Sequence, residues 1–222
     1  MKKYLLAVTM FLLATTALVS CSNDDEKNMP ESMSSVISFE NILEVKDFVE
    51  SGTFMGIGNT DVNAPVILPG QSINFTFHAG KGQALMFATM YGASKDWFFA
   101  PENPGIKLYN DDGTPITGDV SSQIKLWDNG TKVGMTDEKE DADIMMVPGV
   151  DASKLMRLEL SYIAGSSEFK LIVTNTSGGS MNETPFSPGV WAVSNIFNGK
   201  LLNDMPFYSA GAKSNPGITA IA

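Results

Sequence analysis

The sequence predicts an all-β protein, an antiparallel β-sandwich with at most one short helix, on two observations. Short runs in which apolar and polar residues alternate recur from Val36 onward, and a period of two is that of a strand with one buried face. The chain also has 20 glycines and 11 prolines among 222 residues, which indicates many turns and therefore many short strands.

The alternation predicts three strands in particular. Their apolar positions are Ile73, Phe75 and Phe77, then Leu158, Leu160 and Tyr162, then Phe169, Leu171 and Val173. The run 84–91 is apolar almost throughout, which is typical of a strand covered on both faces. Residues 41–50 are the single candidate for a short helix.

Turn sequences separate the predicted strands. They are Pro69-Gly70, Asn103-Pro104-Gly105, Asp111-Asp112-Gly113, Asn129-Gly130 and Pro148-Gly149. Glycine supplies the positive φ that such turns need, and proline presets its own φ. The third of these is interpreted as a hairpin turn, because it lacks the alternating acids of a calcium loop.

Residues 1–20 have the three parts of an export signal. Lys2 and Lys3 come first, an apolar run covers residues 5–13, and small or polar residues follow. The apolar run is too short for a transmembrane helix, which needs about 20 apolar residues. We therefore predict a signal peptide over residues 1–20.

The signal ends at the only cysteine of the chain, Cys21. Residues 18–21 (LVSC) resemble the lipobox of bacterial lipoproteins, in which the cysteine thiol is joined to diacylglycerol before cleavage ahead of it. A single cysteine has no partner for an internal disulfide. We predict that Cys21 is the lipidation site and a membrane anchor, since two or three acyl chains hold a protein durably. The alternative is an ordinary secretory signal with an incidental or buried thiol.

Residues 21–35 are predicted to be a flexible tether. Residues 22–26 read SNDDE, and a polar stretch with Pro30 follows. The acidic run resembles the surface-export signal of Bacteroidetes lipoproteins, which implies an outer-membrane lipoprotein displayed on the cell exterior. A solvated spacer on a periplasm-facing lipoprotein explains the same residues.

The chain is acidic, with a formal charge of −10. Removal of the signal takes away two lysines and no acid, so the remaining chain is more acidic still. We expect no nucleic-acid partner, because neutralising phosphates requires a basic face. Clustered carboxylates favour divalent cations, or simply keep a protein soluble.

Two motifs follow one another in the middle of the chain. The first joins FATM at 87–90 to SKDWF at 94–98, and the second is QIKLWDNGT at 123–131. In this order they resemble the amino-terminal domain of the spondin family, to which F-spondin and mindin belong. There, a buried strand ends in an Asp-aromatic pair, and a second strand runs into Trp-Asp-x-Gly-Thr. The resemblance covers about 38–175.

The resemblance implies a calcium-binding antiparallel sandwich over residues 36–175, related to C2-type modules. It places the metal-binding aspartates at Asp96 and Asp128. Calcium takes six to eight oxygen ligands at about 2.3–2.6 Å, which aspartates and loop carbonyls supply. From the residues alone, Asp96 is equally a turn-capping carboxylate, and Asp128 the first residue of a turn whose side chain bonds its own backbone.

Two features depart from the family's pattern. Lys132 stands where the family has another aspartate, and its cation would repel an ion if it pointed inward. The family's acidic position in the preceding strand has no match, since Phe77 and His78 occupy that neighbourhood. The following acids are either replacement ligands or a solvated loop: Asp137, Glu138, Glu140, Asp141 and Asp143.

Large apolar residues beside these motifs are assigned to packing. We expect Trp97 and Trp127 to lie in the core or its rim rather than to form ligand platforms. Met145, Met146 and Met156 are predicted to fill gaps in the core rather than to bind a metal.

Residues 176–222 are predicted to be an extension. The segment 185–193 (PFSPGVWAV) resembles the opening of a second spondin-type domain, yet the sequence stops where the family continues through an acidic segment. The extension is therefore a degenerate copy or a truncated one. Because its apolar residues need partners, we expect it to pack within one enlarged domain.

The residue inventory argues against an enzyme. The sole histidine, His78, lies within a strand pattern, and no nucleophile motif accompanies it. Carboxylates that meet in space are the one catalytic alternative left open. The sequence favours a lipid-anchored extracytoplasmic binding or adhesion module, assisted by calcium, with a surface glycan or protein as its ligand. The alternative is a structural subunit of a cell-surface assembly that pairs through exposed edge strands.

Overall fold

The computed structural model describes Ser38 and residues 49–57, 65–202 and 206–221. All its strands belong to one compact unit, Glu44–Ala222. The predicted signal peptide, Cys21, the tether and most of the helix candidate at 41–50 lie outside the described residues. Glu50, the last residue of that candidate, begins a strand. In the part that is described, no helix combines the length and apolar character needed to cross a membrane.

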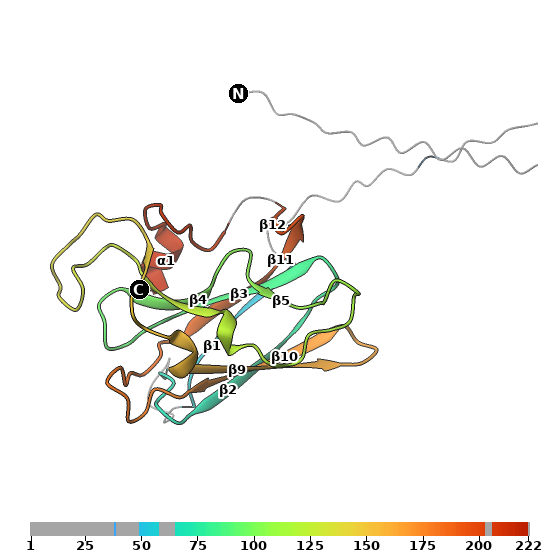
Figure 1. Cartoon of the computed structure of the whole chain (residues 1–222), viewed down its shortest axis with the longest axis horizontal. Helices are drawn as coiled ribbons and strands as arrows, with labels where there is room; N and C mark the ends of the chain where they lie inside the picture. The colour runs from blue at the N-terminus through green and yellow to red at the C-terminus, as the bar shows by residue number, and fades with distance from the viewer. Residues whose placement is uncertain (1–37, 39–48, 58–64, 203–205, 222) are drawn as a thin grey trace, which may run out of the picture. The chain divides into compact units, whose positions relative to one another are not determined.

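The described strands form two antiparallel sheets, which confirms the predicted all-β fold class (Figure 1). The first sheet has eight strands in the spatial order β1-β11-β3-β4-β7-β8, with β5 beside β3 and β12 beside β11. The bounds are β1 Glu50–Phe54, β3 Gln83–Met90, β4 Trp97–Pro101, β5 Ile106–Lys107, β7 Ile124–Asp128, β8 Met145–Met146, β11 Gly189–Phe197 and β12 Lys200–Leu201.

The second sheet has four strands in the order β2-β10-β9-β6. The bounds are β2 Ser72–His78, β6 Gly118–Asp119, β9 Met156–Ile163 and β10 Glu168–Asn175. Two short 3-10 helices, η1 (Ser121–Gln123) and η2 (Ala152–Lys154), join strands, and an α-helix, α1 (Pro216–Ile221), ends the described chain.

An aromatic core joins the two sheets. In β2 the odd-numbered residues are buried and the even-numbered ones exposed, as the alternation predicts. Phe77 stacks on Phe169 of its own sheet with ring centroids 5.7 Å apart, and Phe75 stacks on Trp191 of the other sheet at 5.2 Å. Burial of these rings against both sheets contributes to the hydrophobic stabilisation of the sandwich.

The strand β3 is covered on both faces, as its continuous apolar run predicts. Leu85 and Phe87 belong to the core between the sheets, whereas Met86 and Ala88 belong to a second cluster on the outer face. The C-terminal segment covers that outer cluster, chiefly through Tyr208 and Ile218. Three other members come from β4 and β7: Phe98, Ala100 and Trp127.

Residues after Asn175 are part of the sandwich. β11 lies between β1 and β3, so that Trp191 is paired with Gly52 on one side and with Phe87 on the other. The boundary drawn at residue 175 therefore does not coincide with an edge of the fold. The sequence pattern does not predict α1. Its first turn is capped by Asn215 Oδ1, which accepts the N–H groups of residues 217 and 218.

All five predicted turn glycines have positive φ, as turns of these types require. They are Gly70, Gly105, Gly113, Gly130 and Gly149.

The predicted packing of the methionines holds for one of three. Met156 is buried, but Met145 and Met146 are 60% and 51% exposed, so the prediction that they fill the core is wrong. The reason is that they form β8, which pairs with β7 alone at the end of the sheet.

Candidate functional site

The predicted metal ligands meet at one end of the first sheet. β4 and β7 pair in antiparallel register with Trp97 opposite Asp128. Asp96 immediately precedes β4, and Asn129 immediately follows β7. The pairing ends there, so Asp96 and Asn129 are the first residues beyond it on the two segments.

One carboxylate oxygen of Asp96 ties the loop after β7 to the start of β4. Asp96 Oδ2 accepts the backbone N–H groups of Thr131 at 2.8 Å and Lys132 at 2.7 Å, and the hydroxyl of Thr131 at 3.1 Å. Asp96 therefore caps the turn after β7, which is the role predicted for it from the residues alone. The other oxygen, Oδ1, is buried and has no hydrogen-bond partner among the described residues.

The other buried polar atoms without a hydrogen-bond partner in the described part of the chain belong to Asn129. Its side chain is fully buried, and neither Oδ1 nor Nδ2 has a partner in the described part of the chain. A buried polar group without a partner costs about 1–3 kcal/mol, and native proteins usually satisfy it with protein, water or an ion. The buried atoms without partners in the described part of the chain thus belong to Asp96 and Asn129, the residues just beyond the end of the β4–β7 pairing.

Asp128 is held by two hydrogen bonds at the rim of this buried pair. Its Oδ1 accepts the backbone N–H of Gly130 at 2.9 Å, and its Oδ2 accepts the indole N–H of Trp97 at 2.9 Å. The first bond is the one that the turn interpretation of Asp128 predicted. Because each carboxylate oxygen has two lone pairs, both oxygens retain capacity for a further ligand.

Gly130 lets the following loop pass close to the site. Its φ is +68°, and a Cβ at this position would lie 2.5 Å from the carbonyl oxygen of Ala142. The two residues are joined by a hydrogen bond of 2.9 Å from Ala142 N–H to the Gly130 carbonyl. Only glycine permits this approach, which folds residues 130–142 back over the end of β7.

The electrostatics at Asp96 favour either a proton or a cation. Burial raises the pKa of its carboxyl group above the ordinary value for aspartate. Hydrogen bonds from Lys132 and Thr131 oppose this shift in the pKa without cancelling it, and the negative charge of Asp128 adds to it. A divalent cation would supply the positive charge that the buried carboxylate lacks.

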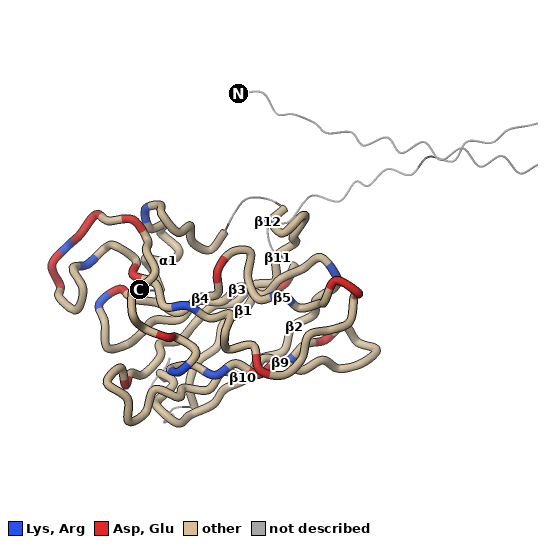
Figure 2. The backbone as a smooth tube through the Cα atoms, viewed as in Figure 1, with Lys and Arg blue, Asp and Glu red and all other residues tan. Residues whose placement is uncertain are grey.

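Three of the acids in the 130–143 loop form ion pairs at the surface, and Figure 2 shows acidic and basic positions side by side there. Asp137 pairs with Lys95 at 3.1 Å, and Lys213 lies 3.3 Å from Asp141 and 3.2 Å from Asp143. The ammonium of Lys132 lies 3.4 Å from the Asp137 carbonyl. No group of three or more His, Cys, Asp or Glu side chains among the described residues is arranged to hold a metal.

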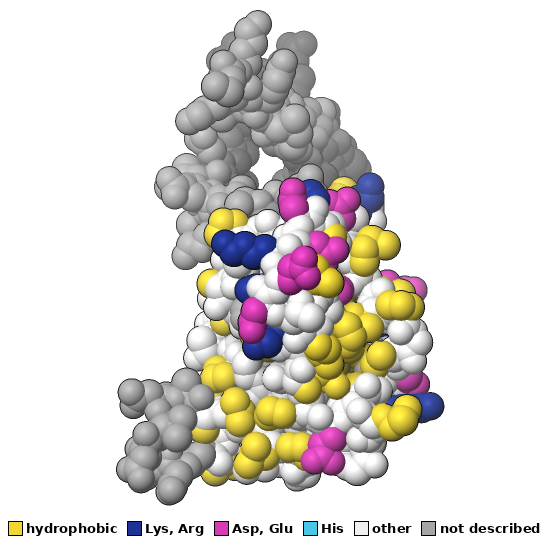
Figure 3. All heavy atoms as spheres, turned by 90° about the vertical axis from the view of Figure 1, so that its left-hand side faces the viewer, with side chains coloured by type: hydrophobic (Ala, Val, Ile, Leu, Met, Phe, Trp, Pro, Cys, Tyr) yellow, Lys and Arg dark blue, Asp and Glu magenta, His cyan; other side chains and the backbone are white. Residues whose placement is uncertain are grey.

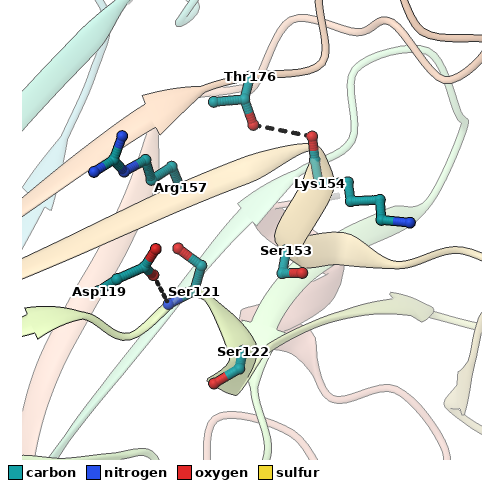
Figure 4. Close-up of a pocket in the computed structure, with 7 residues that line it drawn as sticks. All are labelled: Asp119, Ser121, Ser122, Ser153, Lys154, Arg157 and Thr176. Carbon is teal, nitrogen blue, oxygen red and sulfur yellow. Dashed lines mark hydrogen bonds between the residues drawn. The ribbon is translucent and has the colours of Figure 1, made fainter.

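A larger cavity lies elsewhere, between η1, η2 and the start of β9 (Figure 4). It is an open basin of about 730 Å³, lined by Asp119, Ser121, Ser122, Ser153, Lys154, Arg157 and Thr176. Most of its polar groups are satisfied within the chain. Thr176 donates to the Lys154 carbonyl, and Arg157 pairs with Glu159 at 2.9 Å. The basin has few free groups with which to recognise a ligand.

Comparisons with models of known families, with curated proteins and with solved structures found no match. The function is therefore inferred from the residues of this chain.

Proposed function

We propose that this chain is a lipid-anchored, extracytoplasmic binding module, similar to the spondin amino-terminal domain, whose binding end is ordered by calcium. Asp96, Asn129 and Asp128 would hold the ion. The observation that carries the proposal is the set of buried atoms without partners, Asp96 Oδ1 and the Asn129 carboxamide, at the end of β7, where the charge of a second carboxylate, that of Asp128, acts on Asp96.

The chemistry of these residues fits calcium. Calcium prefers hard oxygen ligands in flexible geometry, and it accepts carboxylates, side-chain carbonyls, backbone carbonyls and water together. Asp96 Oδ1 and Asn129 Oδ1 are such oxygens, and neither has a partner among the described residues. Two carboxylates and one carboxamide leave several positions for backbone carbonyls and water.

Calcium would act here by joining segments rather than by catalysis. The residues that would hold the ion come from the start of β4 and the end of β7, and the loop that follows them returns through Gly130 and Ala142. A cation shared by these segments would order the loop for binding a partner.

Calcium is expected to raise the thermal stability of the chain from Ser22, which retains every described strand. At a free calcium concentration of one hundred times Kd, binding to the native state adds about 2.7 kcal/mol to the free energy of unfolding. For a chain of this size, that corresponds to a rise in Tm of about 5–10 °C over the same protein in chelator. A structural subunit that pairs through its edge strands does not require this dependence.

Two variants locate the ion. Asp96→Asn is expected to abolish the calcium response, and in chelator it should be at least as stable as the parent, because a buried unpaired charge has been removed. The matched control is Asp111→Asn, an exposed acid in a hairpin turn, which should keep the full response. No change in Tm for the parent chain would reject the metal site, and a response that survives Asp96→Asn would place the ion elsewhere.

The pH dependence of the free energy of unfolding provides a further check. Since the fold raises the pKa of Asp96, protonation of Asp96 stabilises the calcium-free protein, fully below the ordinary pKa of aspartate. This stabilisation is lost as the pH rises through the raised pKa. Calcium and the proton compete for the Asp96 carboxylate, so the difference in Tm between calcium and chelator should become smaller in acid.

Lipid attachment at Cys21 is expected to be visible by labelling cells with a palmitate analogue. The parent chain should carry the label and partition with membranes, because two or three acyl chains give durable anchoring. Cys21→Ser should lose both properties, whereas Ser20→Ala, a change to another small residue in the same motif, should keep them. Label retained by Cys21→Ser would refute the lipidation site.

A further inference from the structure

A small pocket opens beside the candidate metal site, at the end of the first sheet. Its volume is about 170 Å³, well below the roughly 300–1,000 Å³ of pockets that take drug-sized ligands. Because a water molecule occupies about 30 Å³ in the liquid, the pocket has room for roughly five or six groups of that size. That is the size of one long side chain.

Part of the pocket wall is apolar and exposed to solvent. Trp97 is half-buried, and the hydrogen bond from its indole N–H to Asp128 fixes the ring in place. Met145 and Met146 of β8 also line the pocket although both side chains are more than half exposed. Figure 3, which views this end of the sandwich, shows hydrophobic side chains exposed between acidic ones. Exposed apolar side chains gathered at a cavity indicate a binding surface.

The charges of the pocket are of one sign. Asp128, Glu140 and Asp143 line it, and no described lysine or arginine does. Asp143 shares the ammonium of Lys213, but no ion pair in the described part of the chain involves Asp128 or Glu140.

An apolar wall with carboxylates beside it matches one kind of ligand group. A lysine or arginine side chain buries its methylene stem against apolar surface and keeps its charged end at a carboxylate. The indole ring of Trp97 adds a favourable face for a cation. The acidity of the whole chain, with a charge of −10, also draws basic partners.

We propose that this pocket receives a lysine or arginine side chain of a partner protein. The inference rests on the proposed function, since it names the partner chemistry of the binding module, but it does not require calcium. β8 is the terminal strand of the first sheet among the described residues. Backbone hydrogen bonds join Ile144, just ahead of β8, to Gly211 and Ala212, so an extended partner chain would approach the remaining edge at Met145 and Met146.

The test is a titration of the chain from Ser22 with a glycine-lysine peptide, followed through the indole N–H resonances of the three tryptophans. Trp97→Phe identifies the resonance of Trp97. We expect this resonance to shift saturably with the lysine peptide and to stay in place with a peptide that has norleucine at the lysine positions. No shift with lysine, or equal binding of norleucine, would overturn the proposal.

Variants with a matched control separate the pocket from general attraction to an acidic protein. Glu140→Gln and Met146→Ala should each raise the Kd of the lysine peptide about threefold or more. Glu138→Gln removes an exposed acid from the same loop that does not line the pocket, and it should leave the Kd unchanged. If all three variants bind as the parent does, the pocket is not the site.

Repeating the titration in calcium and in chelator distinguishes this inference from the proposed function. Lysine binding in chelator without any calcium effect on Tm would support the pocket and reject the metal site. A calcium-dependent Tm without lysine binding would reject the pocket alone.

Discussion

A chain that ends at Asn175 is expected to lose cooperative unfolding altogether. Such a chain retains the whole segment that resembles one spondin-type domain, but it lacks β11. Because β11 lies between β1 and β3, its removal leaves β1 without a neighbour among the described strands of the first sheet and takes Trp191 out of the aromatic core. Unpaired strand edges and uncovered aromatic rings together favour unfolding and aggregation.

The measurement is a thermal unfolding curve by circular dichroism for three chains that begin at Ser22. The chain that ends at Ala222 should show one cooperative transition, and the chain that ends at Asn175 should show none. A chain that ends at Leu202 keeps both sheets but loses Tyr208 and Ile218 from the outer cluster, so it should unfold cooperatively at a lower temperature. A cooperative transition at the parent's Tm in the shortest chain would contradict the central place of β11.

Replacement of Trp191 by alanine is expected to reduce the free energy of unfolding by about 3–5 kcal/mol. The indole ring is buried, stacks on Phe75 at 5.2 Å and lies 5.9 Å from Phe77, centroid to centroid. Across the strand pair, a Cβ on Gly52 would lie within 2.9 Å of the indole ring, so the glycine provides the space that the ring fills. Alanine would leave a cavity between the sheets that the neighbouring strands cannot close.

The corresponding fall in Tm is about 6–20 °C for a chain of this size. Phe197→Ala is the matched control, because this residue ends the same strand with its ring 67% exposed, and its loss should change the free energy of unfolding by less than about 0.5 kcal/mol. Equal effects of the two substitutions would show that the ring of Trp191 does not pack as the structure has it.

The sequence predicts those parts of the fold that depend on local pattern. The alternation around Phe75 specifies a strand with one buried face, and the apolar run through Phe87 specifies a strand buried on two faces. Positive φ at Gly113 follows from its place in a turn. Each of these properties is decided by residues within a few positions of one another, which is the range over which a periodic pattern acts.

The pairing of distant segments is not specified locally. β11 joins β3 across about one hundred residues, and the apolar residues around Trp191 fit a second domain as well as they fit an enlarged first one. Likewise, an apolar sequence at Met145 and Met146 predicts burial, whereas their exposure follows from the position of β8 at the end of the sheet. Sheet order is a tertiary property that no short window contains.

The candidate site was predicted in part. Asp96 immediately precedes β4 and Asp128 ends β7, so the antiparallel pairing of these two strands brings the aspartates of both motifs to one end of the sheet. Asn129 was interpreted only as a turn residue, because asparagine before glycine is common in turns. Its burial follows from the return of the chain at Ala142 over Gly130. The glycine permits this close contact, but its presence in the sequence does not predict the contact.

The position of β1 also determines how tension enters the molecule. Whatever pulls on the chain ahead of Val49 acts first on β1, whose one neighbour among the described strands of its sheet is β11. Two non-covalent contacts between β1 and the second sheet share that load. Glu50 accepts the backbone N–H of His78 at 2.6 Å, and the ring of Phe54 stacks on that of Phe75 with centroids 5.4 Å apart. Force applied at this end is therefore distributed over both sheets before any strand can peel away.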